Sequence, residues 1–600
     1  MPRRQSRPRP ARTQDLSLVN TYNDLHSVDG LDPRSRRAAT TNRYSPVLLL
    51  VALIAGVGVI AYAAFLLNPS IRGDLLPWLI VIAAEAILVF HAIMALWTML
   101  SGYGQQPSYA FQNAQANLFR PEANELLDSP DDPTTWPLHI DGAPVNVDVL
   151  ITVYGEPLNV IRRTAEAAMA MRGAHDTYIC DDGDSDDVRD LADSLGCGYI
   201  RRLGGAGAKA GNVNHALTIA KSPYFIILDA DFVAKPDFLE ETLPAMVDPN
   251  VAFVQTPQVY GNLHNVISRG AGYMQTMFYR FVQPGRNEFN AAFCVGTNVL
   301  FRRAAIDDIG GIYTQSKSED VWTSLLLHER GWRSVFQPRE LAVGDAPDTV
   351  EAYSKQQLRW ATGGFEILLT HNPLSPHRRL SLDQRLMYFV TATHYLTGIA
   401  PGLLMFVPAL EIFFDLRPVT MNVPWYQWVL FYSGFYVLQV LLAAVIAGTF
   451  RWEVLLLSLN SFPIYIKALM NAWLKVDTKW SVTGTTGGRT SAFNFIHVQV
   501  YAFVFLACTT AVSLWRDQMM SSFTVATFWC AVNTLSLGTF LVVAALEDRD
   551  RRLRAKGKRH SPRRINTDDD DATPKPAPLD AESIEQAKAA QYELANSVRN

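Results

Sequence analysis

The sequence is poor in charge and in cysteine, and both shortages narrow the classes of protein to consider. Charged residues make up only 18% of 600 positions while 49% are hydrophobic, a balance that exceeds what one water-soluble domain needs. The few cysteines show no Cys-x-x-Cys spacing, so we expect reduced, structural thiols rather than a metal site. They are Cys180, Cys197, Cys294, Cys508 and Cys530.

Two long runs near the N-terminus contain almost no charge. Val47 to Leu67 carries none, and Pro77 to Leu100 carries only Glu85 and His91. Each run is long enough to cross a hydrocarbon core of roughly 30 Å. The first run lies too far from the N-terminus for a cleaved signal peptide. The sequence therefore predicts a polytopic membrane protein, and further apolar blocks follow a polar middle segment at 386–414, 425–450, 453–474, 492–515 and 522–546.

The distribution of basic residues predicts how these helices are oriented. Nine arginines precede the first run and nine Lys or Arg lie in Arg549–Arg564, whereas the predicted outer loops hold only Arg72, Arg417 and Arg516. Both termini should therefore be cytoplasmic, which requires an even number of crossings. We interpret the least apolar block, 453–474, as an amphipathic helix at the cytoplasmic interface. Six spans are then expected, two before and four after the polar segment.

These assignments divide the chain into seven parts. We expect a disordered basic N-terminus and a disordered cytoplasmic tail at its two ends. Membrane topology accounts for the terminal arginines without a nucleic-acid partner. The expected parts are 1–45, transmembrane helices 1 and 2 in 46–100, a cytoplasmic catalytic domain in 101–385, helices 3 and 4 in 386–452, an interface helix and loop in 453–490, helices 5 and 6 in 491–546, and the tail 547–600.

From Val145 the pattern alternates strands with helices, which predicts an α/β domain with a mostly parallel sheet. Ligands bind beyond the carboxyl ends of strands in such sheets. Three predicted strands end in Tyr154-Gly155-Glu156, Asp181-Asp182-Gly183 and Asp229-Ala230-Asp231. Acidic ends that converge on one edge suggest a nucleotide and metal site, and the oxygen-only pair Asp229 and Asp231 suits Mg²⁺ or Mn²⁺. A lone Asp-x-Asp would equally suit a turn that caps the next helix.

The segment Gly205-x-Gly207-x-x-Ala210 imitates a dinucleotide-binding fingerprint, since Asp229 follows about twenty residues later. It comes after the third predicted strand rather than the first, where a dinucleotide fold places the motif. We therefore favour a helix start at which Lys209 offers a cation to a diphosphate. A dinucleotide-dependent membrane oxidoreductase is kept as a remote alternative.

Two later motifs suggest a base and a sugar platform. Ser318-Glu319-Asp320 opens an amphipathic helix with Ser318 as N-cap, where the helix dipole favours an ionised Asp320. Such a carboxylate can accept the proton of an attacking alcohol. In the motif Gln356-Gln357-Leu358-Arg359-Trp360, the residues Gln356, Arg359 and Trp360 share one face of a helix. The guanidinium fork of Arg359 suits phosphate oxygens, and the ring of Trp360 offers an aromatic surface for a sugar. Each motif alone also suits a purely structural helix.

In this order the motifs resemble those of the cellulose-synthase-type processive glycosyltransferases of family 2, inverting enzymes whose cytoplasmic GT-A domain lies between transmembrane helices. The family pattern is Asp-Asp-Gly, Asp-x-Asp, Thr-Glu-Asp and Gln-x-x-Arg-Trp, and here Ser318 replaces the threonine. The resemblance covers roughly residues 145–489 and implies a GT-A fold for the α/β domain. Many cellulose synthases also carry a PilZ domain that binds cyclic di-GMP, and we expect none in the short tail.

The resemblance implies a role for each motif. Asp320 would be the general base, and Asp229 with Asp231 would hold Mg²⁺ or Mn²⁺. Within Trp480-Ser481-Val482-Thr483-Gly484-Thr485, which is similar to the mobile donor-covering loop of the family, Thr483 would contact the donor. There Thr485 replaces a lysine, whose charge Arg489 would supply. The expected donor-binding residues are Asp181, Asp182, Lys209, Asp229, Asp231, Gln356, Arg359 and Thr483, and the expected acceptor-binding residues are Trp360, Gly296, Thr297 and Asn298.

We therefore expect a β-glucan synthase of the cell (plasma or inner) membrane that uses UDP-glucose, favours β-1,4 linkage and passes the nascent β-glycan through its own helices. An accessory subunit would be compatible with this hypothesis. The alternatives are a chitin-like or hyaluronan-like synthase that uses UDP-N-acetylhexosamine, and a non-processive transferase to a lipid. A transporter without catalysis would leave Asp320 and the Gln-x-x-Arg-Trp motif unexplained.

Overall fold

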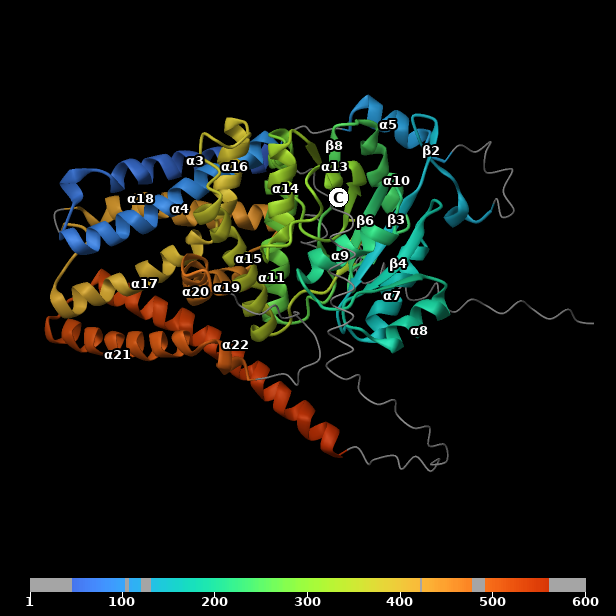
Figure 1. Cartoon of the computed structure of the whole chain (residues 1–600). Helices are drawn as coiled ribbons and strands as arrows, with labels where there is room; N and C mark the ends of the chain where they lie inside the picture. Colours follow the sequence, from blue (N-terminus) through green and yellow to red (C-terminus); the bar gives the residue numbers. More distant parts are fainter. Residues whose placement is uncertain (1–45, 103–106, 120–130, 421–422, 477–490, 561–600) are drawn as a thin grey trace, which may run out of the picture. The chain divides into compact units, whose positions relative to one another are not determined.

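The computed structural model describes residues 46–102, 107–119, 131–420, 423–476 and 491–560 (Figure 1). It divides into two units, Met1–Asp548 and Arg549–Asn600. All elements of the α/β domain belong to the first unit. The N-terminus predicted to be disordered, most of the tail and the loop that carries Thr483 and Arg489 lie outside the described residues.

A seven-stranded sheet forms the centre of the α/β domain. The strand order is β11-β8-β10-β6-β3-β4-β5. All neighbouring strands are parallel except β10, which runs antiparallel to both β6 and β8. The predicted mostly parallel α/β fold is therefore confirmed. The strands are β3 (Val147–Val153), β4 (Asp176–Asp181), β5 (Gly198–Arg201), β6 (Tyr224–Asp229), β8 (Val251–Gln255), β10 (Val299–Arg302) and β11 (Arg333–Phe336).

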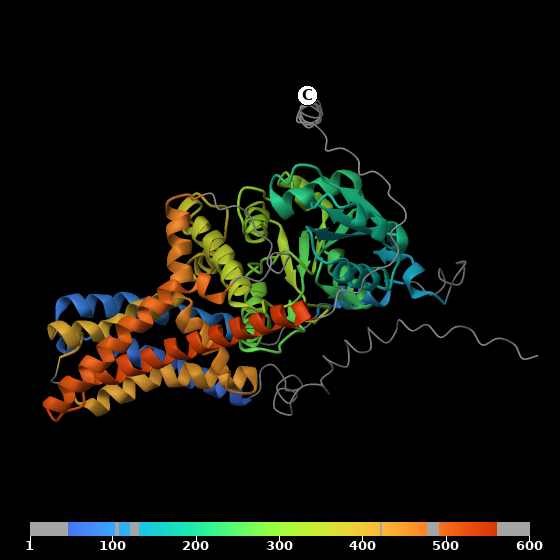
Figure 2. The same ribbon diagram turned by 90° about the horizontal axis from the view of Figure 1, so that it is seen from below.

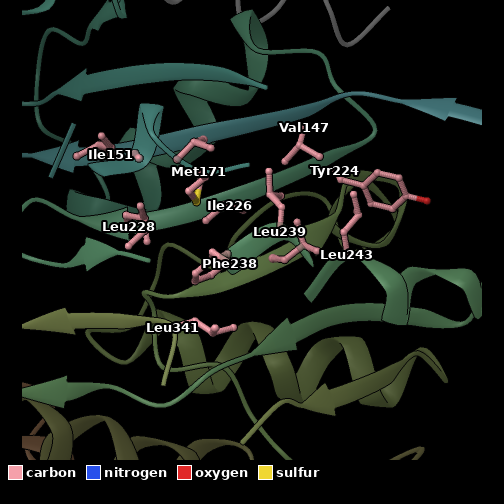
Figure 3. Close-up of a cluster of buried hydrophobic side chains, with 14 of the residues drawn as sticks. Val147, Ile151, Met171, Tyr224, Ile226, Leu228, Phe238, Leu239, Leu243 and Leu341 are labelled. Atoms are coloured by element: carbon pink, nitrogen blue, oxygen red, sulfur yellow. The ribbon is translucent and has the colours of Figure 1, made fainter. Parts of the chain in front are cut away.

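Both faces of the sheet are buried, which explains why its strands read as continuous apolar runs. Along β3, Val149 and Ile151 pack into one core and Leu150 into the other, since side chains alternate across a strand. Figure 3 shows the first core, where Phe238 lies among side chains of the sheet. The helices of the domain are α5 (Tyr109–Ala116), α7 (Leu158–Met169), α8 (Asp186–Leu195), α9 (Ala208–Ile219), α10 (Phe238–Thr242), α11 (Val266–Met277), α12 (Gln283–Glu288), α13 (Arg303–Asp308), α14 (Glu319–Glu329) and α15 (Val350–Thr370).

A small second sheet lies beside the Asp-x-Asp motif. Its order is β7-β12-β9, where β7 is Val233–Ala234, β12 is Ala342–Gly344 and β9 is Val259–Tyr260. Strand β12 is antiparallel to β7 and parallel to β9. This pairing brings the residue that follows β12, Asp345, into the electrostatic neighbourhood of Asp231.

Six helices of the described chain are long and apolar enough to cross a membrane, two before and four after the α/β domain. The two apolar helices predicted before the domain and the four predicted after it are confirmed as candidate spans, which indicates a multi-pass membrane protein. The helices lie side by side in both views (Figure 1, Figure 2). They are α3 (Pro46–Leu66), α4 (Leu75–Ser101), α17 (Leu396–Phe414), α18 (Trp425–Ala447), α21 (His497–Met519) and α22 (Val525–His560).

Two predicted blocks differ from the observed helices. The block 386–414 is two helices, because α16 (Leu382–Thr393) ends before α17 begins at Leu396. The block 453–474 is also two helices, α19 (Trp452–Asn460) and α20 (Phe462–Trp473), which meet at 44°. Pro463 lies in the first turn of α20, where a proline favours the start of a new helix. By length and composition the bent pair would also suit a broken span, and its interface position stays a prediction.

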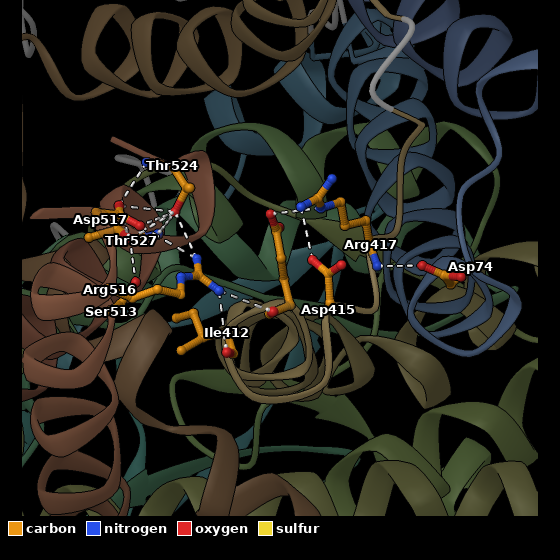
Figure 4. A network of polar contacts seen from close by, with 10 residues as sticks. Asp74, Ile412, Asp415, Arg417, Ser513, Arg516, Asp517, Thr524 and Thr527 are labelled. Carbon is orange, nitrogen blue, oxygen red and sulfur yellow. Dashed lines mark hydrogen bonds and ion pairs between the residues drawn. The ribbon is translucent and has the colours of Figure 1, made fainter. Parts of the chain in front are cut away.

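A polar network ties the ends of the membrane helices that lie away from the α/β domain (Figure 4). Arg417 forms ion pairs with Glu411 and Asp415 at 3.3 and 2.9 Å, and its backbone N–H donates to Asp74 at 2.8 Å. On the neighbouring helix Arg516 lies 3.5 Å from Asp517. The carboxylate of Asp517 accepts in turn from the hydroxyl of Thr527, at 2.6 Å, and from the backbone N–H of Thr524, at 2.8 Å.

Candidate active site

The carboxyl ends of three parallel strands meet at one edge of the large sheet. Val153 at the end of β3 pairs with Asp181 on β4, and Thr152 pairs with Asp229 on β6. Strands β4 and β6 therefore flank the end of β3 on either side. The two acidic motifs lie at the same edge of the sheet, as the sequence pattern predicted. The edge also receives Glu156, whose pKa is raised by burial.

The two aspartates that follow β4 have different partners. Asp181 is fully buried, and its carboxylate accepts from the backbone N–H groups of Gly183 and Ser185 at 2.7 and 2.8 Å. Asp182 pairs through Oδ2 with Arg202 at 2.6 Å, while its buried Oδ1 has no hydrogen-bond partner among the described residues. Asp181 thus shapes the loop, and Asp182 keeps an acceptor for a ligand. The predicted donor contact therefore suits Asp182 better than Asp181.

Lys209 opens α9 and reaches the Asp-x-Asp motif. Its ammonium group forms an ion pair with Asp229 and donates to the carbonyl oxygen of Gly296 at 2.6 Å. The backbone N–H of Asp229 donates to the hydroxyl of Thr297 at 2.9 Å. The side chains of Thr297 and Asn298 are fully buried, so they hold Asp229 and its strand in place. Their contact with an acceptor stays a prediction. Because both side chains are buried, they would act on the acceptor only indirectly.

Asp231 lies in a surplus of negative charge. Burial, together with the carboxylates of Asp229, Asp345 and Glu156, raises its pKa to about 7. In the described residues no three His, Cys, Asp or Glu side chains are placed to hold a metal ion together. Two carboxylates still fit Mg²⁺ or Mn²⁺ if donor phosphates complete the coordination, the usual arrangement for Mg²⁺ at nucleotide sites.

The start of α14 departs from the prediction in how it is capped. Ser318 occupies the N-cap position, but its side chain makes no capping hydrogen bond. It packs instead against Gly363 of α15, where an added Cβ would lie 2.0 Å from Oγ of Ser318. The carboxylate of Asp320 takes over one unpaired donor, because Oδ1 accepts from the backbone N–H of Val321 at 2.8 Å.

Asp320 is not kept ionised by the helix dipole alone. Burial raises its pKa, while the Val321 N–H and the charges of Arg359 and Lys209 lower it. Burial also raises the pKa of the neighbouring Glu319. Asp320 and Lys209 face each other across Gly296, since an added Cβ at that glycine would lie 3.6 Å from Oδ2 of Asp320 and 3.6 Å from Nζ of Lys209. The predicted base thus lies next to the predicted donor-binding lysine.

Helix α15 brings the Gln-x-x-Arg-Trp motif to the same place. Two hydrogen bonds hold α15 against α20. Tyr353 bonds to Ser461, the residue before α20, at 3.0 Å, and the hydroxyl of Tyr465 donates to Gln357 at 3.0 Å. Arg359 acts electrostatically on Asp320. The site is therefore attached to the membrane-side helices by the helix that carries Arg359.

A cavity of about 540 Å³ leads from this place in among the membrane helices. Asp320, Gln356 and Trp360 are among its lining residues. Beyond them it is bounded by α4, α11, α12, α17 and α18, with polar groups set in a largely aromatic and aliphatic wall. The lining residues include His91, Thr98, Tyr279, Arg286, Thr391, His394, Tyr395, Val440 and Tyr465.

Two arginines of the site were not found from the sequence. Arg202 directly follows β5 in the run Gly-Tyr-Ile-Arg-Arg, and a basic residue just after a strand and beside an acidic loop was the available signal. Arg286 lies in a short helix that only tertiary packing brings to the cavity. No local pattern in the sequence marks it.

Comparisons with known proteins agree with this arrangement. A family model described as Glycosyl transferase family group 2 matches residues 224–543, more than half of the chain. Cellulose synthase 2 of Novacetimonas hansenii is 32% identical over 346 residues, which cover 55% of this chain and 20% of that protein. The UDP-forming cellulose synthase catalytic subunit of Xanthomonas axonopodis pv. citri is 32% identical over 281 residues, which cover 44% and 38%.

Among solved structures, a mannosyltransferase from Pyrobaculum calidifontis in complex with GDP-Man and Mn²⁺ is 15% identical, with a TM-score of 0.41. The alignment covers 65% of this chain and 99% of that one. The chain spans well under half of the length of the curated relatives named above.

Proposed function

Because this chain belongs to glycosyl transferase family group 2, we propose that it transfers glucose from UDP-glucose, with inversion, to the growing end of a β-glucan. Transfer is processive, and the product leaves through the membrane helices of the same chain. The linkage is β-1,4 in this proposal. The α/β domain and both termini face the cytoplasm, where UDP-sugars are made.

The cavity carries this proposal. It is lined by Asp320 and Trp360 and also by residues of the membrane helices. An enzyme that releases a small soluble product needs no such passage. A cavity with aromatic walls and a few polar groups suits a glycan, whose rings stack on aromatic faces and whose hydroxyls need hydrogen bonds.

The chemistry follows from the charges around Gly296. Asp320 takes the proton of the acceptor hydroxyl as that oxygen attacks the anomeric carbon, and the bond to the UDP oxygen breaks on the opposite side. Lys209 and Arg359 stabilise the charge that develops on the leaving diphosphate. A bound Mg²⁺ or Mn²⁺ at Asp229 and Asp231 would supply further charge stabilisation there. A single displacement on an α-linked donor gives a β-linked product.

In the ligand-free arrangement Lys209 already neutralises Asp229. On donor binding the ammonium group of Lys209 turns to the diphosphate, which frees the carboxylate of Asp229; Asp229 and Asp231 are the residues that would hold a metal ion. The bond to the Gly296 carbonyl holds the ammonium group at the site, so less side-chain entropy is lost when the diphosphate binds. Trp360 holds the terminal sugar of the acceptor by stacking.

The test is direct. The purified protein in detergent is given radiolabelled UDP-glucose or UDP-N-acetylglucosamine with Mg²⁺ or Mn²⁺, and any polymer is digested with linkage-specific glycosidases. We expect a glucose polymer that a β-1,4-glucanase degrades. Incorporation of N-acetylglucosamine alone would overturn the choice of sugar, and no incorporation from any UDP-sugar, together with no UDP binding, would overturn the synthase function.

A further inference from the structure

Arg286 is a buried cation that the transfer reaction does not use. Its side chain is 3% exposed, and burial lowers its pKa to about 10. No carboxylate of the described residues forms an ion pair with it. One guanidinium N–H donates to the hydroxyl of Thr391, the group lies over the ring of Phe293 at 5.2 Å, and the Nε–H is left without a partner. Such a cation is costly unless something else compensates it.

The position of Arg286 is fixed by close packing. At the preceding residue, Gly285, an added Cβ would lie 1.8 Å from the carbonyl oxygen of Thr98 on α4. Helix α12 is therefore pressed against α4, and Thr391 anchors the guanidinium from α16. The side chain lines the cavity, so a ligand in the cavity is the remaining group that can compensate the guanidinium charge.

His91 supplies an acceptor at the same part of the wall. Its Nε2 lies 3.2 Å from the hydroxyl of Thr393, and that hydroxyl already donates to the carbonyl of Phe389 at 2.8 Å. The Thr393 oxygen must therefore accept from Nε2–H, which leaves Nδ1 of a neutral His91 as an acceptor. His394 lies next to it, with ring centroids 6.1 Å apart, and also lines the cavity.

A wall that offers a strong donor beside an acceptor matches a hydroxyl group, which donates and accepts at once. A free oxyanion would use the guanidinium but would be repelled by the lone pair at Nδ1. We propose that Arg286, with His91 and His394, forms a sugar-binding subsite that holds the hydroxyls of product units after they have passed Trp360. This subsite rests on the proposed function. Its affinity for the product determines how long a chain stays bound between transfers, and hence the length of the polymer.

Arg286→Met separates this role from a structural one. Removing an unpaired buried charge should leave the protein equally stable or more stable. The product should nevertheless become shorter, and the KM for a short β-linked gluco-oligosaccharide acceptor should rise about tenfold, the loss expected for a hydrogen bond to a charged group. The KM for UDP-glucose should not change. Arg286→Lys, which keeps the charge but loses the fork, should give an intermediate length.

The matched control is Arg280→Lys. Arg280 lies just before α12 and donates to the carbonyl of Ile446 at 3.3 Å, but it does not line the cavity. Product length should be unchanged in this variant. Unchanged length and acceptor KM in Arg286→Met would overturn the subsite, as would a fall in melting temperature that accompanies a loss of UDP binding.

A direct measurement of oligosaccharide binding distinguishes a failure of the subsite from a failure of the proposed function. If the wild-type protein incorporates no sugar from any UDP-sugar, the synthase function fails. The gluco-oligosaccharide should still bind the wild-type protein in nanodiscs about tenfold more tightly than it binds Arg286→Met. Equal binding to both proteins would overturn the subsite whatever the reaction proves to be.

Discussion

Two groups of arginines in this protein have opposite surroundings. At the far ends of the membrane helices, Arg417 and Arg516 each lie against carboxylates (Figure 4). In the cavity wall, Arg286 has a hydroxyl and an aromatic ring but no carboxylate from the part of the chain that the structure describes. Arg516 also leaves its Nε–H without a hydrogen bond, so what separates the groups is the countercharge.

The difference indicates what each region is for. A charge whose partner is in the same chain adds to stability when the pair stays intact, and removing one partner is costly. A charge without a partner adds nothing to stability and is compensated when a ligand binds. The same division applies to the carboxylates, since Asp517 is surrounded by donors whereas Asp231 lies among other acids.

The largest expected effect breaks the chemistry and leaves the fold intact. In Asp320→Asn, transfer should fall by about 10³-fold, within the range measured for loss of a general base. UDP binding should be retained, because Lys209 and Arg359 remain, and melting temperature should not fall, since burial already disfavours the ionised form. Radiolabel incorporation, UDP titration and thermal melting check this result. Normal elongation by the variant would refute the base assignment.

The opposite outcome is expected in the far network. Asp517→Asn leaves Arg516 without its carboxylate and weakens the bonds from Thr524 and Thr527, so the free energy of unfolding should fall by about 3 kcal/mol. Transfer per folded molecule should be unchanged. Denaturant unfolding in detergent measures the free energy of unfolding, and radiolabel incorporation measures transfer.

The matched control for this variant is Asp550→Asn. That residue forms an exposed pair with Arg549 at 3.9 Å, and loss of such a pair should have no measurable effect on stability. A stable Asp517→Asn protein with impaired transfer would contradict the division between the two regions.

A smaller effect tests how the site is held. Gly363→Ala places a Cβ 2.0 Å from Oγ of Ser318, so α14 must move away from α15 and carry Asp320 with it. Overpacking of this kind costs about 1–3 kcal/mol, and transfer should fall together with stability. Gly364→Ala is the control, because its nearest neighbours would lie at 3.6 Å, an ordinary contact distance. Equal behaviour of the two variants would show that the glycine contact does not position the base.

Much of the fold followed from the sequence because the strands are buried on both faces. Runs such as Tyr224–Asp229 mark a parallel strand without knowledge of its neighbours. The antiparallel β10 was not predicted, since Val299–Arg302 is short and its pairing with β6 and β8 depends on chain reversal at a distance. The break between α16 and α17 was missed because the apolar composition continues across it.

The site was predictable where chemistry is local. Asp229 and Asp231 stand at the end of a buried strand, and this local pattern was enough to predict an acidic site there. Roles that depend on packing were not predictable. Ser318 has the residue type of an N-cap, yet its hydroxyl packs against Gly363, a contact between two helices that are distant in sequence. Arg286 likewise acquires its place only when α12 packs on α4.

The smallest expected effect is a shift in pH dependence. Burial favours the neutral form of Asp320, so its pKa lies above the usual value near 4, and only the ionised form can act as a base. At saturating donor, kcat should therefore fall as the pH is lowered through that raised pKa. Arg359→Met removes a charge that lowers the pKa, so the acid limb should move to higher pH, by less than about one unit at the distance of a partly screened pair. Arg516→Met, which changes only the far network, should leave the limb where it is. If the acid limb moved equally in both variants, it would report unfolding rather than the protonation of Asp320. The contrast between the two regions would then no longer hold for Asp320.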